Sequence, residues 1–124
     1  MKINKLIALA FLAVLILACG NKAGSDAAGG KTEVVNGETI STFKVWGNCD
    51  MCKETIEGSL KVDGISKAEW STETNMISVS YDESKISLDQ IHKNIAAVGY
   101  DTDKFKGDDK TYSTLPECCQ YERK

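Results

Sequence analysis

The sequence has little of several residues on which common protein chemistries depend. It contains one proline, Pro116, and one histidine, His92, among 124 residues. A single histidine without neighbouring ligands is a weak sign of a metal site, so we expect His92 to be a solvated residue on a helix surface. The sequence also lacks a nucleophile–base set and a glycine-rich phosphate loop. We therefore expect a protein that is not an enzyme.

The sequence also lacks an excess of positive charge. The chain carries 15 Lys and Arg residues against 18 Asp and Glu residues, which gives a formal net charge of −3. No basic face with interleaved aromatic residues occurs, and an acidic domain of this kind is a poor candidate for nucleic-acid binding. The length suits one small domain.

The longest apolar run lies near the N-terminus and is too short for a membrane span, which needs about 20 residues. Two lysines precede the apolar run, and the run ends at Ile16-Leu17-Ala18-Cys19. This pattern is typical of an export signal. Its end resembles a bacterial lipobox, although Leu17 replaces the usual small or hydroxyl residue. We expect residues 1–18 to be a lipoprotein signal peptide; an ordinary signal peptide or an N-terminal anchor helix is the alternative.

A lipoprotein signal would place the protein in the bacterial cell envelope, exported and lipid-anchored to a membrane on its periplasm-facing side. Cys19 would become the acylated N-terminus, and several acyl chains hold a protein stably at a bilayer. Loss of Lys2 and Lys5 with the signal peptide would move the net charge from −3 to −5, because no acidic residue leaves with them. Residues 19–31 are rich in Gly, Ala and Ser and are expected to form a flexible tether.

Residues 32–105 show the patterns of one α+β domain. Alternating apolar residues predict strands, and a four-residue apolar spacing predicts helices. The predicted strands are 40–46, 65–72, 77–81 and a short fourth one at 100–105, and the predicted helices are 53–60 and 88–98. The order is β-α-β-β-α-β, the ferredoxin-like arrangement, in which two helices cover one face of a four-stranded antiparallel sheet.

The strongest chemical signal is Cys49-Asp50-Met51-Cys52, which follows the first predicted strand and opens the first predicted helix. Two thiols three residues apart can reach one metal ion, and a helix N-terminus favours the thiolate form. Two thiolates suit a soft ion such as Cu(I), whereas a structural zinc site needs four ligands. An exposed pair also suits transfer of the ion to a partner's thiols.

Two other interpretations of the Cys49 and Cys52 pair remain open. One is a dithiol redox couple in an envelope thiol–disulfide protein. A thioredoxin-like fold, however, normally has a cis-proline beside its thiols, and Pro116 lies in the C-terminal tail. The other is a structural disulfide, which would constrain only a short loop.

Residues from about Thr39 to Phe105 resemble the heavy-metal-associated domain family. This family includes bacterial copper chaperones, metal-binding domains of copper-exporting P-type ATPases and the periplasmic mercury-binding protein. The resemblance rests on the element order and on Trp46-Gly47-Asn48-Cys49-Asp50-Met51-Cys52. Both cysteines match the family motif Gly-Met-x-Cys-x-x-Cys, and Gly47 replaces the family methionine, which packs beneath the metal-binding loop. Val98-Gly99-Tyr100 matches a Gly-Tyr pair near that loop in bacterial copper chaperones.

The resemblance implies a protein that binds Cu(I) first, with Hg(II) or another thiophilic ion as the alternative. It would sequester the ion or hand it to a metal-transporting ATPase or another envelope metalloprotein. Tyr100 would shield the site or hydrogen-bond to it; the alternative is a half-buried tyrosine at the start of a strand. Met51 lies between the thiols and is a candidate thioether ligand or a cap on the loop.

The C-terminal tail, residues 106–124, carries the adjacent pair Cys118 and Cys119. These cysteines could close a vicinal disulfide, bind a metal ion separately or pair with another chain. They could also add two thiolates to Cys49 and Cys52 if the tail folds back. Apolar residues that would let the tail dock on the domain are Tyr112, Leu115 and Tyr121.

Overall fold

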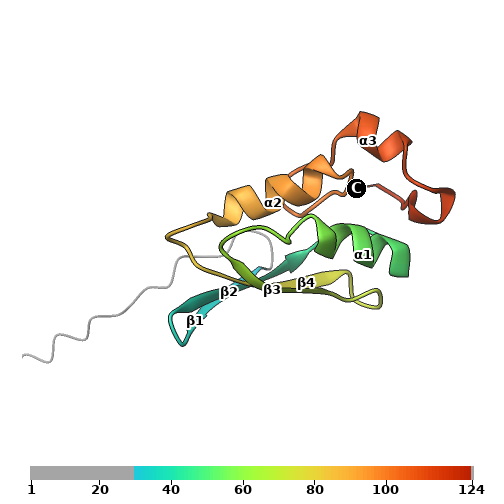
Figure 1. The fold of residues 1–124 in the computed structure, drawn as a ribbon. Coiled ribbons are helices and arrows are strands. Elements are labelled where there is room, and N and C mark those ends of the chain that lie inside the picture. The colour runs from blue at the N-terminus through green and yellow to red at the C-terminus, as the bar shows by residue number, and fades with distance from the viewer. Residues whose placement is uncertain (1–29, 124) are drawn as a thin grey trace, which may run out of the picture.

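The computed structural model describes residues 30–123 of the protein (Figure 1). The predicted signal peptide at 1–18, the predicted acylation site at Cys19 and most of the predicted tether lie outside the described residues. Within the described range, no helix is long and apolar enough to cross a membrane.

A four-stranded antiparallel sheet forms one layer of the domain. In the central pair of strands, Phe43 lies opposite Ile77 and Ser41 lies opposite Val79, with their side chains on the buried face. The strands lie in the order β1-β2-β4-β3, with the bounds Lys31–Val35 (β1), Glu38–Lys44 (β2), Ile65–Trp70 (β3) and Met76–Tyr81 (β4).

Two helices, α1 (Asp50–Gly58) and α2 (Leu88–Ala97), cover one face of this sheet (Figure 1). Ser87 caps α2 as its sequence predicts, because its hydroxyl accepts a hydrogen bond of 3.2 Å from the backbone N–H of Gln90. Apolar side chains that are fully buried in the core include Val45, Ile56, Leu60, Trp70, Ile77, Val79, Ile91 and Ile95. The predicted fold class, four antiparallel strands with helices on one face, is confirmed.

The fourth strand of the sheet is not the one that the sequence pattern predicts. It is β1, which pairs with β2 through a turn at Asn36 and Gly37, both with positive φ. An Asn-Gly pair with positive φ at both positions is the usual turn of a two-residue hairpin. Periodicity missed β1 because all five of its residues are exposed. Its pairing therefore depends on the backbone ladder and the turn.

The predicted strand at 100–105 is wrong. Only an isolated bridge between Val45 and Thr102 remains of it. The Thr102 hydroxyl accepts hydrogen bonds from the backbone N–H groups of Lys104, at 3.2 Å, and Phe105, at 2.9 Å. These local bonds bend the chain where an extended strand was expected, because a threonine hydroxyl competes with the ladder for backbone donors.

The expectation for His92 is also wrong, because its side chain is only 2% exposed. Its Nδ1 lies 2.8 Å from the Thr102 hydroxyl, and its ring stacks on Phe43 with the centroids 3.9 Å apart. Phe105 packs against the same ring. The segment after α2 thus covers a helix face that lies off the predicted apolar stripe, and His92 is a core residue.

Candidate metal centre

The thiols of Cys49 and Cys52 lie together at the N-terminus of α1. Cys49 is the extended N-cap residue of this helix, and Cys52 lies in its first turn. Their Sγ atoms are 3.6 Å apart. Cys52 is fully buried and accepts a hydrogen bond of 3.4 Å from the backbone N–H of Asn48, whereas Cys49 is half-buried. The strand-to-helix junction therefore presents one accessible thiol and one enclosed thiol.

The Cys49 thiol is acidic. A hydrogen bond from the Cys52 backbone N–H lowers the pKa of Cys49 to about 7, and it outweighs partial burial, which acts in the opposite direction. This is the expected effect of a helix N-terminus, whose free N–H groups stabilise the thiolate. At neutral pH a substantial fraction of Cys49 is therefore already the thiolate, the form that binds a soft metal ion.

We predict that alkylation of Cys49 by iodoacetamide will follow a titration curve with its midpoint near pH 7. A lowered pKa keeps the reactive thiolate populated down to that pH, two units below the ordinary value of 9.0. Peptide mapping by mass spectrometry measures the rate at this residue, with free glutathione as the control. A midpoint for Cys49 equal to that of glutathione would contradict the prediction.

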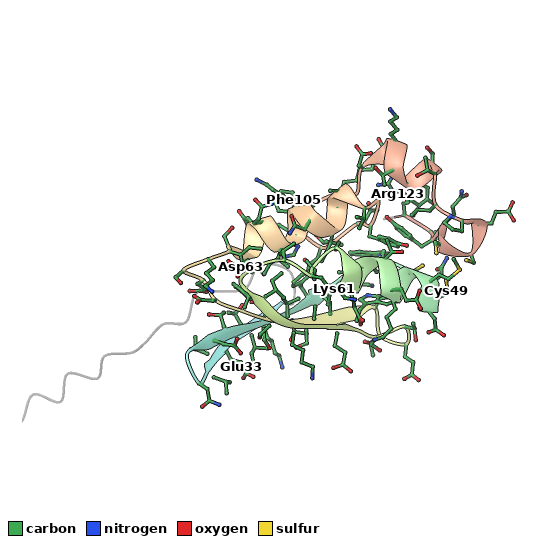
Figure 2. All side chains as sticks on the ribbon, in the orientation of Figure 1. Glu33, Cys49, Lys61, Asp63, Phe105 and Arg123 are labelled. Atoms are coloured by element: carbon green, nitrogen blue, oxygen red, sulfur yellow. The ribbon has the colours of Figure 1, made fainter. Side chains whose placement is uncertain are left out.

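The C-terminal segment folds back over the same end of α1. It contains a short helix, α3 (Asp109–Ser113), and a 3-10 turn, η1 (Glu117–Cys119), and η1 packs against α1. Figure 2 shows Cys49 at the end of α1 beneath this segment, with yellow sulfur atoms gathered around it. Of the alternatives for the tail, the structure favours the one in which it returns to Cys49 and Cys52.

The two tail cysteines join the first pair. The Sγ atoms of Cys49 and Cys119 are 3.8 Å apart, and those of Cys118 and Cys119 are also 3.8 Å apart. The Sγ atoms of Cys49, Cys118 and Cys119 all lie within 4.8 Å of one another. The four cysteines that the structure describes are free thiols. Cys118 also points its thiol at Met51, whose Sδ is 3.5 Å away. A cluster of four thiols and one thioether therefore forms at this end of the molecule.

The cluster has an enclosed side and an open side. Burial raises the pKa of Cys119 to about 12, and hydrogen bonding with the Cys52 thiol adds to this effect. Cys119 is 1% exposed, whereas Cys118 is exposed and Met51 is 50% exposed. A solute therefore reaches the cluster past Met51 and Cys118, and the least accessible sulfurs lie at its base.

Tyr121 anchors the tail to the domain. Its buried hydroxyl accepts a hydrogen bond of 2.8 Å from the Asp101 backbone N–H and donates one of 2.8 Å to the Gly99 carbonyl. Its ring stacks on Tyr100 and receives the edge of Tyr112. Tyr121 was predicted from the sequence to be a docking residue, but its two backbone partners lie 20 and 22 positions away.

An ion pair at the end of the tail completes the docking, and sequence analysis missed it. Arg123 holds the fully buried Asp101 carboxylate with two bonds, Nη2–Oδ1 at 2.6 Å and Nε–Oδ2 at 3.2 Å. Burial alone would raise the pKa of Asp101, but bonds from Arg123 and from the Gly107 N–H outweigh it and lower the pKa. No local pattern marks the pair, because Asp101 and Arg123 belong to different segments.

Tyr100 lies beneath the cluster and is fully buried. Burial raises the pKa of its phenol, and the neighbouring thiols of Cys52 and Cys119 raise it further. Its hydroxyl has no hydrogen-bond partner among the described residues, since neither thiol meets the geometry of a hydrogen bond. Tyr100 thus lies beside the thiols of Cys52 and Cys119, and it does not begin a strand.

Trp70 fills the space beneath the loop, where the family motif has a methionine. A Cβ atom added at Gly47 would lie 2.9 Å from Cη2 and 3.0 Å from Cζ2 of the indole. The ring is fully buried, and its Nε1 donates a hydrogen bond of 3.0 Å to the Val45 carbonyl. The loop is therefore packed tightly against the indole, because the absence of a side chain at Gly47 leaves the space that the ring occupies.

We predict that Gly47→Met, which restores the family residue, will destabilise the domain by about 1–3 kcal/mol through overpacking against Trp70. Thermal and urea unfolding measure the change. Gly58→Met is the matched control, because no atom lies within 4 Å of a Cβ added at Gly58. The account of Trp70 would be wrong if the two variants were equally stable.

A ferredoxin-like sheet-and-helix layer with a thiol cluster at a strand-to-helix junction defines a small α+β domain of the metal-binding type. The heavy-metal-associated domain family matches residues 42–101. The chain is 34% identical over 70 residues to the copper chaperone CopZ of Staphylococcus haemolyticus, which covers 56% of this chain and 93% of that protein. The chain belongs to the heavy-metal-associated domain family.

Two further proteins are similar to this chain. CopZ of Staphylococcus aureus is 36% identical over 70 residues, again covering 56% of this chain and 93% of that protein. A solved structure described as a CopZ metallochaperone is 34% identical, with a TM-score of 0.49, and covers 51% of this chain and 97% of that chain. The family match ends at residue 101, so the tail with Cys118 and Cys119 lies outside it.

Proposed function

We propose that this protein binds a soft metal ion, Cu(I) before Hg(II) or other thiophilic ions, through Cys49 and Cys52. The observation that carries this proposal is the 3.6 Å separation of the two Sγ atoms at the N-terminus of α1. Soft thiolates select Cu(I) and similar ions over hard cations. Family membership supports heavy-metal binding, and the names of the CopZ relatives favour copper.

The bound ion is cargo, and the protein sequesters it or passes it on in the cell envelope. Thiols of a partner displace Cys49 and Cys52 one at a time, so no free ion is released. A metal-transporting ATPase or another envelope metalloprotein is the receiver. In this proposal the acylated Cys19 anchors the protein to a membrane, and the Gly-, Ala- and Ser-rich tether lets the domain reach that receiver.

Titration of the reduced full chain with Cu(I) against a chromophoric Cu(I) chelator tests metal binding, and native mass spectrometry gives the stoichiometry. We expect the protein to withdraw Cu(I) from the chelator. Failure to compete would overturn the proposal. Assays of insulin reduction and of the reduction potential test the alternative, an envelope thiol–disulfide protein, which would reduce insulin whether or not it binds copper.

The anchor has its own test. Cys19→Ser removes the only position in the predicted lipobox that can be acylated, so we expect the protein to move from the membrane fraction to the soluble fraction of fractionated cells. Metal binding by the purified domain should not change. Retention of Cys19→Ser in the membrane fraction would favour an N-terminal anchor helix instead.

A further inference from the structure

We propose that the C-terminal segment completes the metal site, with Cys119 as a third thiolate and Cys118 as a further sulfur at its mouth. The inference rests on the proposed function of Cys49 and Cys52 and deepens it. The protein would then hold a thiophilic ion with three or more sulfurs of its own, where a two-cysteine site leaves the remaining positions to a partner.

The sulfur spacing carries the argument. A metal–sulfur bond of about 2.3 Å separates two sulfur ligands by about 3.8 Å in a tetrahedral site, about 4.0 Å in a trigonal site and about 4.6 Å in a linear one. The Sγ of Cys49 lies 3.6 Å from Cys52 and 3.8 Å from Cys119. Both separations are shorter than the linear value, and the Sγ atoms of Cys49, Cys118 and Cys119 all lie within 4.8 Å of one another, which fits several sulfurs around one ion.

Contacts that do not involve the tail's thiols hold the tail beside Cys49. Tyr121 is bonded to the backbone at Gly99 and Asp101, and Arg123 is paired with the buried Asp101. The Cys118 carbonyl also accepts bonds of 3.4 Å from the Asn48 amide and the Cys49 thiol. Docking therefore brings Cys119 to Cys49 before any ion is bound, which lowers the entropic cost of assembling the ligand set.

A second observation points to a ligand in the cluster. The Tyr100 hydroxyl is buried and lacks a hydrogen-bond partner among the described residues, and it lies beside Cys52 and Cys119. A buried donor without an acceptor is costly. Sulfurs that bind a metal as thiolates carry negative charge and can accept a hydrogen bond from this hydroxyl, so the buried donor is better satisfied when an ion is bound.

The position of the tail has a consequence for transfer. The thiols of a receiving protein must approach Cys49 from the accessible side of the cluster, where Cys118 already lies, with Cys119 buried beside Cys49. The tail sulfurs then occupy the coordination positions that the partner's thiols would otherwise fill. The ion leaves only when a competitor displaces two tail sulfurs as well as the first pair, so the protein retains its cargo more strongly than a two-cysteine site does.

The test is X-ray absorption at the copper edge on the reduced full chain loaded with one equivalent of Cu(I). We expect three or more sulfurs per copper, and native mass spectrometry must show a monomer, so that every sulfur comes from one chain. Cys119→Ser should reduce the sulfur count by one. The same substitution should also lower the affinity for Cu(I) at least tenfold, because even outer-shell substitutions cost about 10- to 100-fold in metal affinity.

Cys118→Ser is the matched variant, because it makes the same substitution one residue away at an exposed position; we expect a smaller loss of affinity and faster transfer to a thiol competitor. Two sulfurs per copper in the unaltered chain would overturn this inference and leave the proposed function intact. Equal affinity of Cys119→Ser and the unaltered chain would do the same. No copper binding at all would overturn both.

Discussion

Replacement of both Cys49 and Cys52 by serine is expected to weaken Cu(I) binding at least 100-fold, since even outer-shell partners of metal sites contribute about 10- to 100-fold each. Serine keeps the approximate size of the side chain but offers a hard, un-ionised oxygen to a soft ion. Cys49 also supplies the thiolate that the helix N-terminus stabilises near neutral pH. Both direct ligands of the proposed site are lost together.

Competition against a chromophoric Cu(I) chelator measures this loss. Cys19→Ser is the matched control, because it makes the same chemical change in a part of the chain that precedes the domain. Circular dichroism must show that the double variant remains folded, since Cys52 is fully buried. Affinity equal to that of the unaltered chain would mean that Cys49 and Cys52 are not the metal site.

Arg123→Ala is expected to release the C-terminal segment. The free energy that favours its docked state should fall by about 2–4 kcal/mol. Removing one partner of a buried ion pair leaves an uncompensated charge, which typically costs about 3–5 kcal/mol. We place the value slightly lower because the Arg123 side chain is 18% exposed. Asp101 is fully buried, and without the guanidinium its charge is left to the Gly107 N–H, the Tyr121 hydroxyl and water drawn in by opening.

Local opening of the tail exposes the uncompensated charge to water at a lower free energy than global unfolding does. The effect should therefore appear in the tail before the whole domain unfolds. Hydrogen exchange of the backbone amides from 109 to 121 measures it. Arg123→Lys is the control: it keeps the charge but cannot form the two-bond fork, so an intermediate rate is expected. Exchange in Arg123→Ala as slow as in the unaltered chain would contradict the role of the pair.

The same pair predicts how docking depends on acid. The folded state lowers the pKa of Asp101 below its unfolded value of about 3.9. The stabilisation is therefore fully present above that value and is lost as the pH falls through the lower, folded pKa. Arg123→Ala should remove this acid-dependent part of the docking, which hydrogen exchange from 109 to 121 at pH 3 to 6 can follow.

Features that depend on near neighbours could be predicted from the sequence. The motif Cys49-Asp50-Met51-Cys52 lies between a strand and a helix whose own residues specify them, and the cap at Ser87 needs only Gln90. The predicted fold class followed from these local patterns. The exposed strand β1 escaped prediction because it has no apolar alternation, although the Asn36-Gly37 turn was a usable signal.

Features that depend on distant contacts required the three-dimensional structure. His92 is a core residue because Thr102 and Phe105 fold over it. The sulfur cluster forms because Tyr121 and Arg123 hold the tail against the segment after α2, and this contact brings Cys119 to Cys49 across 70 positions of sequence. Periodicity and spacing report which residues share a face of one element. They carry no information on contacts between distant segments, and those contacts set the number of thiols at the site.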